Sequence, residues 1–252
     1  MNAREMTFAC LIAAALALVA VWAGIAWAGE GSRQTSRYTL STKLPGHSAA
    51  ERFRFDYVNP DDPAAKPPAV RRVETILPHG ARYDTSAPGS CTASDAELTA
   101  RGSAACPADS AIGGGVVTVD TGVPGDGRIV TADVEFFNNA EDPDGEFIYL
   151  NTVRGTGART VIRADVTLRR TITQVEALPG TPPDGGAIDT VDVTVADVSR
   201  VVDGVRRRYI TTPRRCPSDG RWIARVSFAY EDGVTQTMPT ANRCARRGRR
   251  PR

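Results

Sequence analysis

Apolar and polar residues alternate along most of the chain between residues 38 and 238. Phe53, Phe55 and Tyr57 are separated by charged residues, and every second residue from Trp222 to Tyr230 is apolar. Alternation with a period of two places one set of side chains on each face of a strand and is typical of half-buried strands. The pattern predicts about ten strands, separated by turns rich in glycine, proline and aspartate.

One segment, residues 91–106, departs from this alternation. Ser94 followed by Glu97 is a capping-box pattern, and Gly102 would end the helix that it begins. The sequence therefore predicts one short helix over Asp95–Arg101, placed on a β scaffold. The predicted fold is all-β, an antiparallel β-sandwich of the immunoglobulin-like or jelly-roll kind, with this short helix stapled by a disulfide.

The first 28 residues form the longest apolar segment of the chain. Arg4 precedes the largely apolar run from Met6 to Ala28. A cleaved signal peptide has a charged start and a small-x-small cleavage site, and Ala26-Trp27-Ala28 fits such a site. The alternative is an uncleaved membrane anchor, which needs about 20 apolar residues. In both cases we expect a secreted protein or one on the extracellular face of the cell membrane.

The expected state of the cysteines follows from this compartment. Cys10 lies in the apolar segment, and four cysteines remain after it. An even number in an exported chain predicts disulfides. Each neighbouring pair brackets one local unit, so we expect Cys91–Cys106 and Cys216–Cys244. The sequence has only two histidines and no Cys-x2-Cys spacing, which argues against zinc, and we expect no metal and no cofactor.

Residues 29–245 are predicted to form a single β-sandwich domain. The run Leu178–Gly186 is rich in proline and glycine and could instead divide the chain into residues 36–177 and 187–245. The second of these pieces is small for an independent β core, which favours one domain. Residues 246–252 are rich in arginine and are predicted to be a disordered tail.

The charge of the chain is unevenly distributed. The net charge is only +2, but Arg200–Arg225 holds eight arginines and two aspartates. Such a stretch could bind an anionic cell-wall polymer or a membrane surface. The alternative is that the arginines lie on two faces and pair with acidic residues. Aromatic residues for stacking on bases are not interleaved with them, so no nucleic-acid partner is expected. The candidate anion-binding patch is Arg206, Arg208, Arg214 and Arg215.

Motifs for catalysis are missing from the sequence, which contains no Gly-x-Ser-x-Gly elbow, Walker loop or His-Glu-x-x-His. His47 and His79 lie in turns, where solvated histidines are common. Asp133 and Glu135 alternate as solvent-facing strand positions would, and the acidic residues of 141–146 suit an ordinary turn better than a calcium loop. We expect a non-catalytic binding or structural protein of the cell envelope. The alternative is an extracellular hydrolase acting on wall polymer or polysaccharide.

Two segments carry a resemblance to a known group. They are Leu77–Asp84, which contains Leu-Pro-His-Gly, and Cys106–Gly115, which contains Cys-Pro-Ala-Asp-Ser-Ala-Ile-Gly. Together with Cys91, this pattern resembles uncharacterised exported β-rich proteins of high-GC Gram-positive bacteria that share a Cys-Pro-x-x-Ser-x-Ile-Gly motif. The resemblance covers roughly residues 70–120. It implies export, a Cys91–Cys106 bridge and a β fold, and it carries over no catalytic residue.

Overall fold

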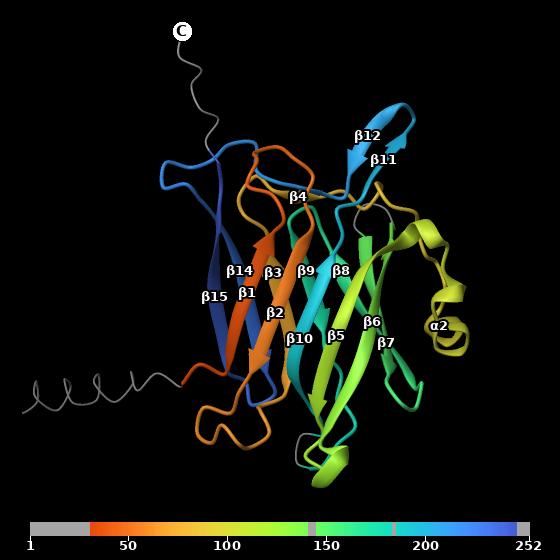
Figure 1. Cartoon of the computed structure of the whole chain (residues 1–252), viewed down its shortest axis with the longest axis vertical. Helices are drawn as coiled ribbons and strands as arrows, with labels where there is room; N and C mark the ends of the chain where they lie inside the picture. The colour runs from red at the N-terminus through yellow and green to blue at the C-terminus, as the bar shows by residue number, and fades with distance from the viewer. Residues whose placement is uncertain (1–30, 141–144, 183–184, 246–252) are drawn as a thin grey trace, which may run out of the picture. The chain divides into compact units, whose positions relative to one another are not determined.

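The computed structural model describes residues 31–140, 145–182 and 185–245 (Figure 1). The fold belongs to the compact unit that begins at Arg33. The predicted signal or anchor segment and the predicted tail lie outside the described residues. Within the described ranges, no helix is both long enough and apolar enough to cross a bilayer.

Antiparallel strands make up most of the described chain. Eleven of them belong to one sheet: β1 Gln34–Leu40, β2 Glu51–Tyr57, β3 Val70–Ile76, β5 Ala111–Asp120, β6 Ile129–Asn139, β7 Gly145–Val153, β8 Arg159–Val166, β9 Arg170–Gln174, β10 Ala187–Val195, β14 Arg221–Tyr230 and β15 Thr235–Arg243. Their order is β1-β2-β10-β5-β6-β7-β8-β9-β3-β14-β15. Because β10 lies between β2 and β5, the strands on the two sides of Leu178–Gly186 share one sheet.

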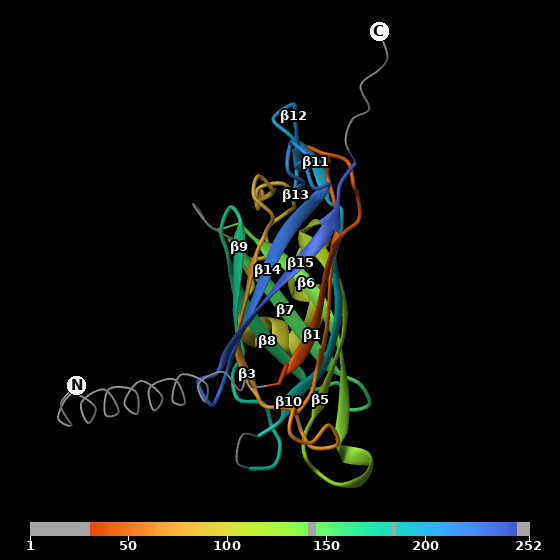
Figure 2. The ribbon, with the colours of Figure 1, turned by 90° about the vertical axis from the view of Figure 1, so that its left-hand side faces the viewer.

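The sheet curls until its edge strands, β1 and β15, come together (Figures 1 and 2). The all-β, antiparallel class predicted from the sequence is confirmed. The arrangement is a nearly closed barrel, however, and not the two-sheet sandwich that the sequence predicted. A single hydrogen-bonded ladder runs through all eleven strands, so the apolar faces belong to one curved sheet.

The seam between β1 and β15 follows from the odd number of strands. Directions alternate in an antiparallel sheet, so the first and eleventh strands run the same way and cannot continue the antiparallel ladder. Side chains bridge them instead. Asn242 accepts a hydrogen bond from the Leu40 amide at 2.8 Å and donates to the Tyr38 carbonyl at 3.3 Å. Gln236 accepts one from the Arg33 amide at 3.1 Å. These bonds hold the barrel together where backbone pairing stops.

The predicted alternation sorts the side chains into an apolar interior and a polar exterior. In β2, Phe53, Phe55 and Tyr57 are buried, and Phe55 and Tyr57 both meet Phe228 of β14 edge to face across the interior, at 5.1 and 5.8 Å between ring centroids. Strands β5 and β10 approach each other closely at glycines of β5. A Cβ atom on Gly115 would overlap a backbone carbonyl oxygen of β10, so glycine is required where these strands bend together.

The predicted helix is present as α2, Asp95–Arg101, followed by the 3₁₀ turns η1 Gly102–Ala105 and η2 Ala108–Ser110. Ser94 and Glu97 form the predicted capping box. Leu98 of α2 packs on Phe137 and Ile148, which point outward from the sheet, so the helix covers a second, smaller apolar cluster on the outside of the barrel.

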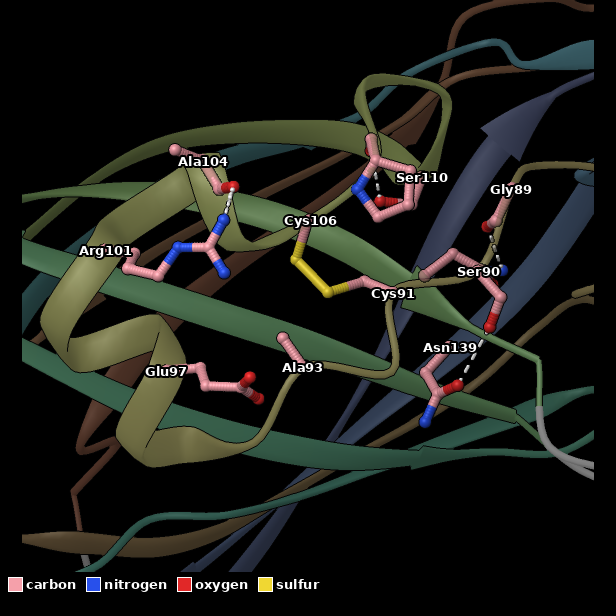
Figure 3. Close-up of a disulfide and its surroundings, with 12 residues drawn as sticks. Gly89, Ser90, Cys91, Ala93, Glu97, Arg101, Ala104, Cys106, Ser110 and Asn139 are labelled. Atoms are coloured by element: carbon pink, nitrogen blue, oxygen red, sulfur yellow. Dashed lines mark hydrogen bonds between the residues drawn. A yellow bond between two sulfur atoms is a disulfide. The ribbon is translucent and has the colours of Figure 1, made fainter.

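Both predicted disulfides are present. Cys91–Cys106 closes the segment that contains α2, with the two Cα atoms 5.0 Å apart (Figure 3). Beside it, the Ser90 hydroxyl bonds to the Asn139 side chain of β6 at 2.9 Å. Cys216–Cys244 joins the chain before β14 to the end of β15, with the Cα atoms 5.7 Å apart. Disulfides are typical of an oxidising compartment.

Two small sheets lie at one end of the barrel, at the top of Figures 1 and 2. β4 (Arg82–Tyr83) pairs with β13 (Ile210–Thr211), and β11 (Ser199–Val202) pairs with β12 (Val205–Arg208). The β11–β12 hairpin turns at Asp203 and Gly204, which have φ of 52° and 75°. Positive φ at both central residues is the requirement of the tight hairpin turn that Asp-Gly favours.

Candidate functional site

A groove of about 410 Å³ opens at the end of the barrel that carries these two small sheets. Its lining comes from four segments: the loop between β1 and β2, the β4 region, strand β12, and strand β13 with the chain that follows it. The lining residues are Gly46, Gly80, Arg82, Asp84, Val205, Arg206, Arg207, Arg208, Thr211, Thr212 and Arg214. Five arginines therefore face one carboxyl group in this groove.

The β4–β13 pair forms a wall between the groove and the barrel interior. Because side chains alternate along a strand, the cross-strand pair Arg82–Thr211 faces the groove while the pair Tyr83–Ile210 is buried in the core. The wall is fixed to the barrel by backbone bonds, such as that from the Tyr83 amide to the Leu168 carbonyl at 2.9 Å.

The loop between β1 and β2 forms a second side of the groove and is held by Thr212. The buried Thr212 hydroxyl donates to the Leu44 carbonyl at 2.8 Å, and its oxygen accepts the His47 amide at 3.0 Å. The Gly46 amide donates to the Pro213 carbonyl at 2.9 Å. These contacts tie the loop to the chain that leads from β13 to Arg214.

Two of the five groove arginines are fixed by the protein. Arg207 donates to the Ser86 hydroxyl at 2.7 Å, and its Nη1 lies 3.7 Å from the Asp84 carboxylate. Arg208 donates to the Gly46 carbonyl at 2.9 Å. Their guanidinium groups are therefore positioned before any ligand arrives.

The other three groove arginines differ from this pair. Arg82, Arg206 and Arg214 are exposed, and their guanidinium groups make no ion pair or hydrogen bond with the residues that the structure describes. A guanidinium presents a planar fork of donors that matches phosphate and carboxylate oxygens. Three unpaired forks on one groove give it the chemistry of an anion site.

The structure brings together three members of the predicted anion-binding patch. Arg206, Arg208 and Arg214 line the groove, whereas Arg215 is exposed outside the lining, and its carbonyl accepts a bond from the Trp222 indole at 2.9 Å. The predicted patch omitted Arg207. It also omitted Arg82, which lies more than one hundred residues earlier in the sequence and reaches the groove only through the pairing of β4 with β13.

The alternative, that these arginines merely pair with acidic residues, holds for part of the stretch. Arg200 forms an ion pair with Asp109 at 2.8 Å, and Arg207 approaches Asp84. It does not hold for Arg82, Arg206 and Arg214, which form no ion pair with any described residue. Charge neutralisation therefore accounts for some of the cluster but leaves the groove strongly positive.

The remaining sequence candidates do not converge. Asp133 and Glu135 are exposed on the outer face of β6, and Asp133 forms an ion pair with Arg154 at 2.6 Å. His47 and His79 are exposed beside Gly46 and Gly80, at the rim of the groove. Of the acidic turn, residues 141–144 lie outside the described ranges. Within those ranges no group of three or more potential metal ligands occurs.

Behind the β4–β13 wall lies a buried carboxyl group that the predicted site did not include. Glu51 is 0% exposed, and the hydroxyls of Tyr83 and Tyr38 donate to it at 2.8 and 3.0 Å. No ion pair to Glu51 is formed by any described residue. Burial raises its pKa from 4.5 to about 7, because the charged form is poorly solvated, although both hydroxyls favour the carboxylate.

A third tyrosine belongs to this cluster. Tyr209 is 0% exposed, its ring centroid lies 6.3 Å from that of Tyr83, and its hydroxyl has no hydrogen-bond partner among the described residues. Burial, and then the charge of Glu51, raise the pKa of Tyr209 well above its usual value. Position 51 is in phase with Phe53, Phe55 and Tyr57, so the alternation of β2 already places its side chain on the inward face. The tyrosines that surround it are visible only in the packing.

Comparison with known proteins adds no functional assignment: no family model matches the sequence, and no curated protein or solved structure matches it. The resemblance to exported proteins of high-GC Gram-positive bacteria stays a prediction. Function is therefore inferred from the residues of the groove.

Proposed function

We propose that this protein is exported and binds, without catalysing a reaction, a cell-envelope polymer that carries repeated phosphate or carboxylate groups. The observation that carries the proposal is the set of three unpaired arginines, Arg82, Arg206 and Arg214, on one groove. The two disulfides support export, because such bonds persist in oxidising compartments.

The composition of the groove supports recognition by charge. Its lining contains no aromatic side chain from the described chain, so a sugar ring would find no face to stack on. A volume of about 410 Å³ lies in the range of sites that hold more than one chemical group. Together with five arginines, this volume favours a ligand with several anionic groups over a single small anion.

The test is a binding titration with end-labelled inorganic polyphosphate, followed by fluorescence anisotropy. Each exposed arginine contributes about 0.5–1 kcal/mol, so the combined substitution Arg82→Ala, Arg206→Ala and Arg214→Ala removes about 1.5–3 kcal/mol and should weaken binding about tenfold to one hundredfold. Arg225→Ala is the matched control, because Arg225 is exposed on the outer face of β14, outside the groove.

Added salt should weaken binding by the unsubstituted protein, because screening reduces attraction between exposed charges. Polyglutamate and phosphatidylglycerol vesicles, run in parallel, separate a carboxylate polymer and a membrane surface from a phosphate polymer. Equal affinity of the triple variant and the Arg225→Ala control for every probe would refute the proposal.

The alternative function, hydrolysis of a glycan, requires two carboxyl groups about 5–10 Å apart in a cleft. Among the described residues, the groove offers one, Asp84, and this carboxylate is close to Arg207. The geometry therefore favours binding. Release of reducing ends from wall polysaccharide by the purified protein would support the hydrolase instead.

A further inference from the structure

We propose that the cluster of Glu51, Tyr38 and Tyr83 is a proton-linked control site for the groove: protonation of Glu51 tightens the β4–β13 wall and strengthens anion binding. This inference rests on the proposed function for its ligand. The effect of Glu51 on the wall does not depend on a ligand and is tested without one.

The first step is that Glu51 and the groove share one short structural element. Tyr83 donates to Glu51 on the inner side of β4, and its neighbour Arg82 faces the groove on the outer side. Glu51 is also connected to the groove by the chain itself, since it begins β2 directly after the loop that carries Gly46. A change at Glu51 therefore reaches two sides of the groove, one through Tyr83 to the adjacent Arg82 and the other along the short chain segment back to Gly46.

The second step concerns the charge of Glu51. The groups that face it are phenols from four parts of the fold: Tyr38 of β1, Tyr83 of β4, Tyr149 of β7, and Tyr209, which precedes β13. None of them supplies a positive charge. An ionised Glu51 is thus an uncompensated charge in the core, which favours water entry or displacement of the wall. A protonated Glu51 removes that cost.

The third step is linkage. An anion in the groove and a charge on Glu51 are both negative and lie on opposite sides of the same wall, so each disfavours the other. Binding of the anion must then favour protonation of Glu51, and protonation must favour binding by the same factor. Because burial places the pKa of Glu51 at about 7, this linkage would operate near neutral pH.

The rim histidines need a separate control. His47 and His79 adjoin groove residues, and histidine itself gains charge between about pH 8 and pH 5. A positive charge on an imidazole at the rim would itself attract an anion. The comparison is therefore made in a His47→Gln, His79→Gln background, in which Glu51 is the remaining candidate.

The ligand-free experiment measures hydrogen exchange of the Tyr83 and Asp84 amides at about pH 6 and about pH 8, corrected for intrinsic exchange rates. These amides donate to the Leu168 and Tyr209 carbonyls. With Glu51 present, protection should be at least about tenfold lower at the higher pH. Glu51→Gln should remove this difference. Equal protection at both pH values with Glu51 present would overturn the inference.

The ligand experiment measures polyphosphate affinity in the histidine-free background at the same two pH values. Affinity should be about fivefold tighter at the lower pH, and Glu51→Gln should abolish the ratio. Glu135→Gln, an exposed carboxyl on β6, is the matched control and should leave it unchanged. A ratio that survives Glu51→Gln contradicts the inference. If polyphosphate fails to bind at either pH, the proposed function fails, while the exchange experiment still decides the role of Glu51.

A second variant, Tyr83→Phe, tests the same inference if Glu51→Gln does not fold. Tyr83→Phe removes one hydroxyl donor from the carboxylate, so the pH at which wall protection falls should shift upward. An unchanged midpoint in Tyr83→Phe would show that wall protection does not follow the ionisation of Glu51, which would overturn the inference.

Discussion

Replacing Glu51 by glutamine should make the protein more stable at neutral and alkaline pH. The carboxyl is fully buried, and burial raises its pKa from 4.5 to about 7. The folded state therefore holds the proton more tightly than the unfolded chain does. The stability that this proton contributes is complete below the unfolded pKa, declines as pH rises from there, and is fully lost above about pH 7.

The size of the effect follows from the shift of the pKa. The interval from 4.5 to about 7 corresponds to about 3 kcal/mol of unfolding free energy, at about 1.4 kcal/mol per pH unit. Glutamine has a similar shape and cannot ionise. In acid, Glu51→Gln and the parent protein should differ by only about 1 kcal/mol, the scale of an altered hydrogen bond. At about pH 8 the variant should be more stable by up to about 3 kcal/mol.

The assay is urea unfolding with both disulfides intact, from about pH 5 to about pH 8.5. Trp222 is 2% exposed and reports unfolding by its fluorescence. A parent protein whose stability, relative to Glu51→Gln, stays constant over this pH range would refute the reasoning. So would a variant that is the less stable of the two at alkaline pH, because that result would show that Glu51 is ionised at little cost.

Three further predictions concern the frame around the groove. Replacing both Cys216 and Cys244 by serine should loosen the chain next to Arg214 and lower the affinity for polyphosphate. An affinity equal to that of the parent protein, at a temperature where both proteins remain folded, would contradict this. Asn242→Ala removes two bonds across the seam and should cost about 1–2 kcal/mol in urea unfolding, and a neutral result would show that the seam bonds are not needed. Gly115→Ala should cost more than about 3 kcal/mol because its Cβ overlaps the β10 backbone, whereas Gly127→Ala, with its nearest atom at 3.6 Å, should be tolerated; equal stabilities would refute the packing argument.

Much of the local structure could be predicted because it depends on near neighbours. The alternation in β2 and β14 determined which residues face inward, and the Ser94–Glu97 capping box located the start of α2. The two disulfides were predictable because each joins cysteines that are neighbours among those of the described chain, at separations of 15 and 28 residues.

The candidate site could be predicted only in part. Arg206, Arg208 and Arg214 were found because they lie in one charged stretch, but Arg82 belongs to a distant segment. Glu51 is in phase with the inward-facing residues of β2, so the alternation indicates its face, but the sequence does not show which groups surround it. The position of Arg82 in the groove and the tyrosines around Glu51 depend on contacts between segments far apart in the chain, which local patterns do not encode.

The sequence by itself determined the class of structure: antiparallel strands with one capped helix, the two disulfides Cys91–Cys106 and Cys216–Cys244, and an excess of arginine in residues 200–225. Only the tertiary structure decided that the strands form one curled sheet rather than two stacked ones. Alternation specifies which face of a strand is apolar, and both arrangements satisfy it equally well. The pairing of β4 with β13 gathers Arg82 with the other arginines on one side of a wall, and on the other side Glu51 has no positive partner among the described residues.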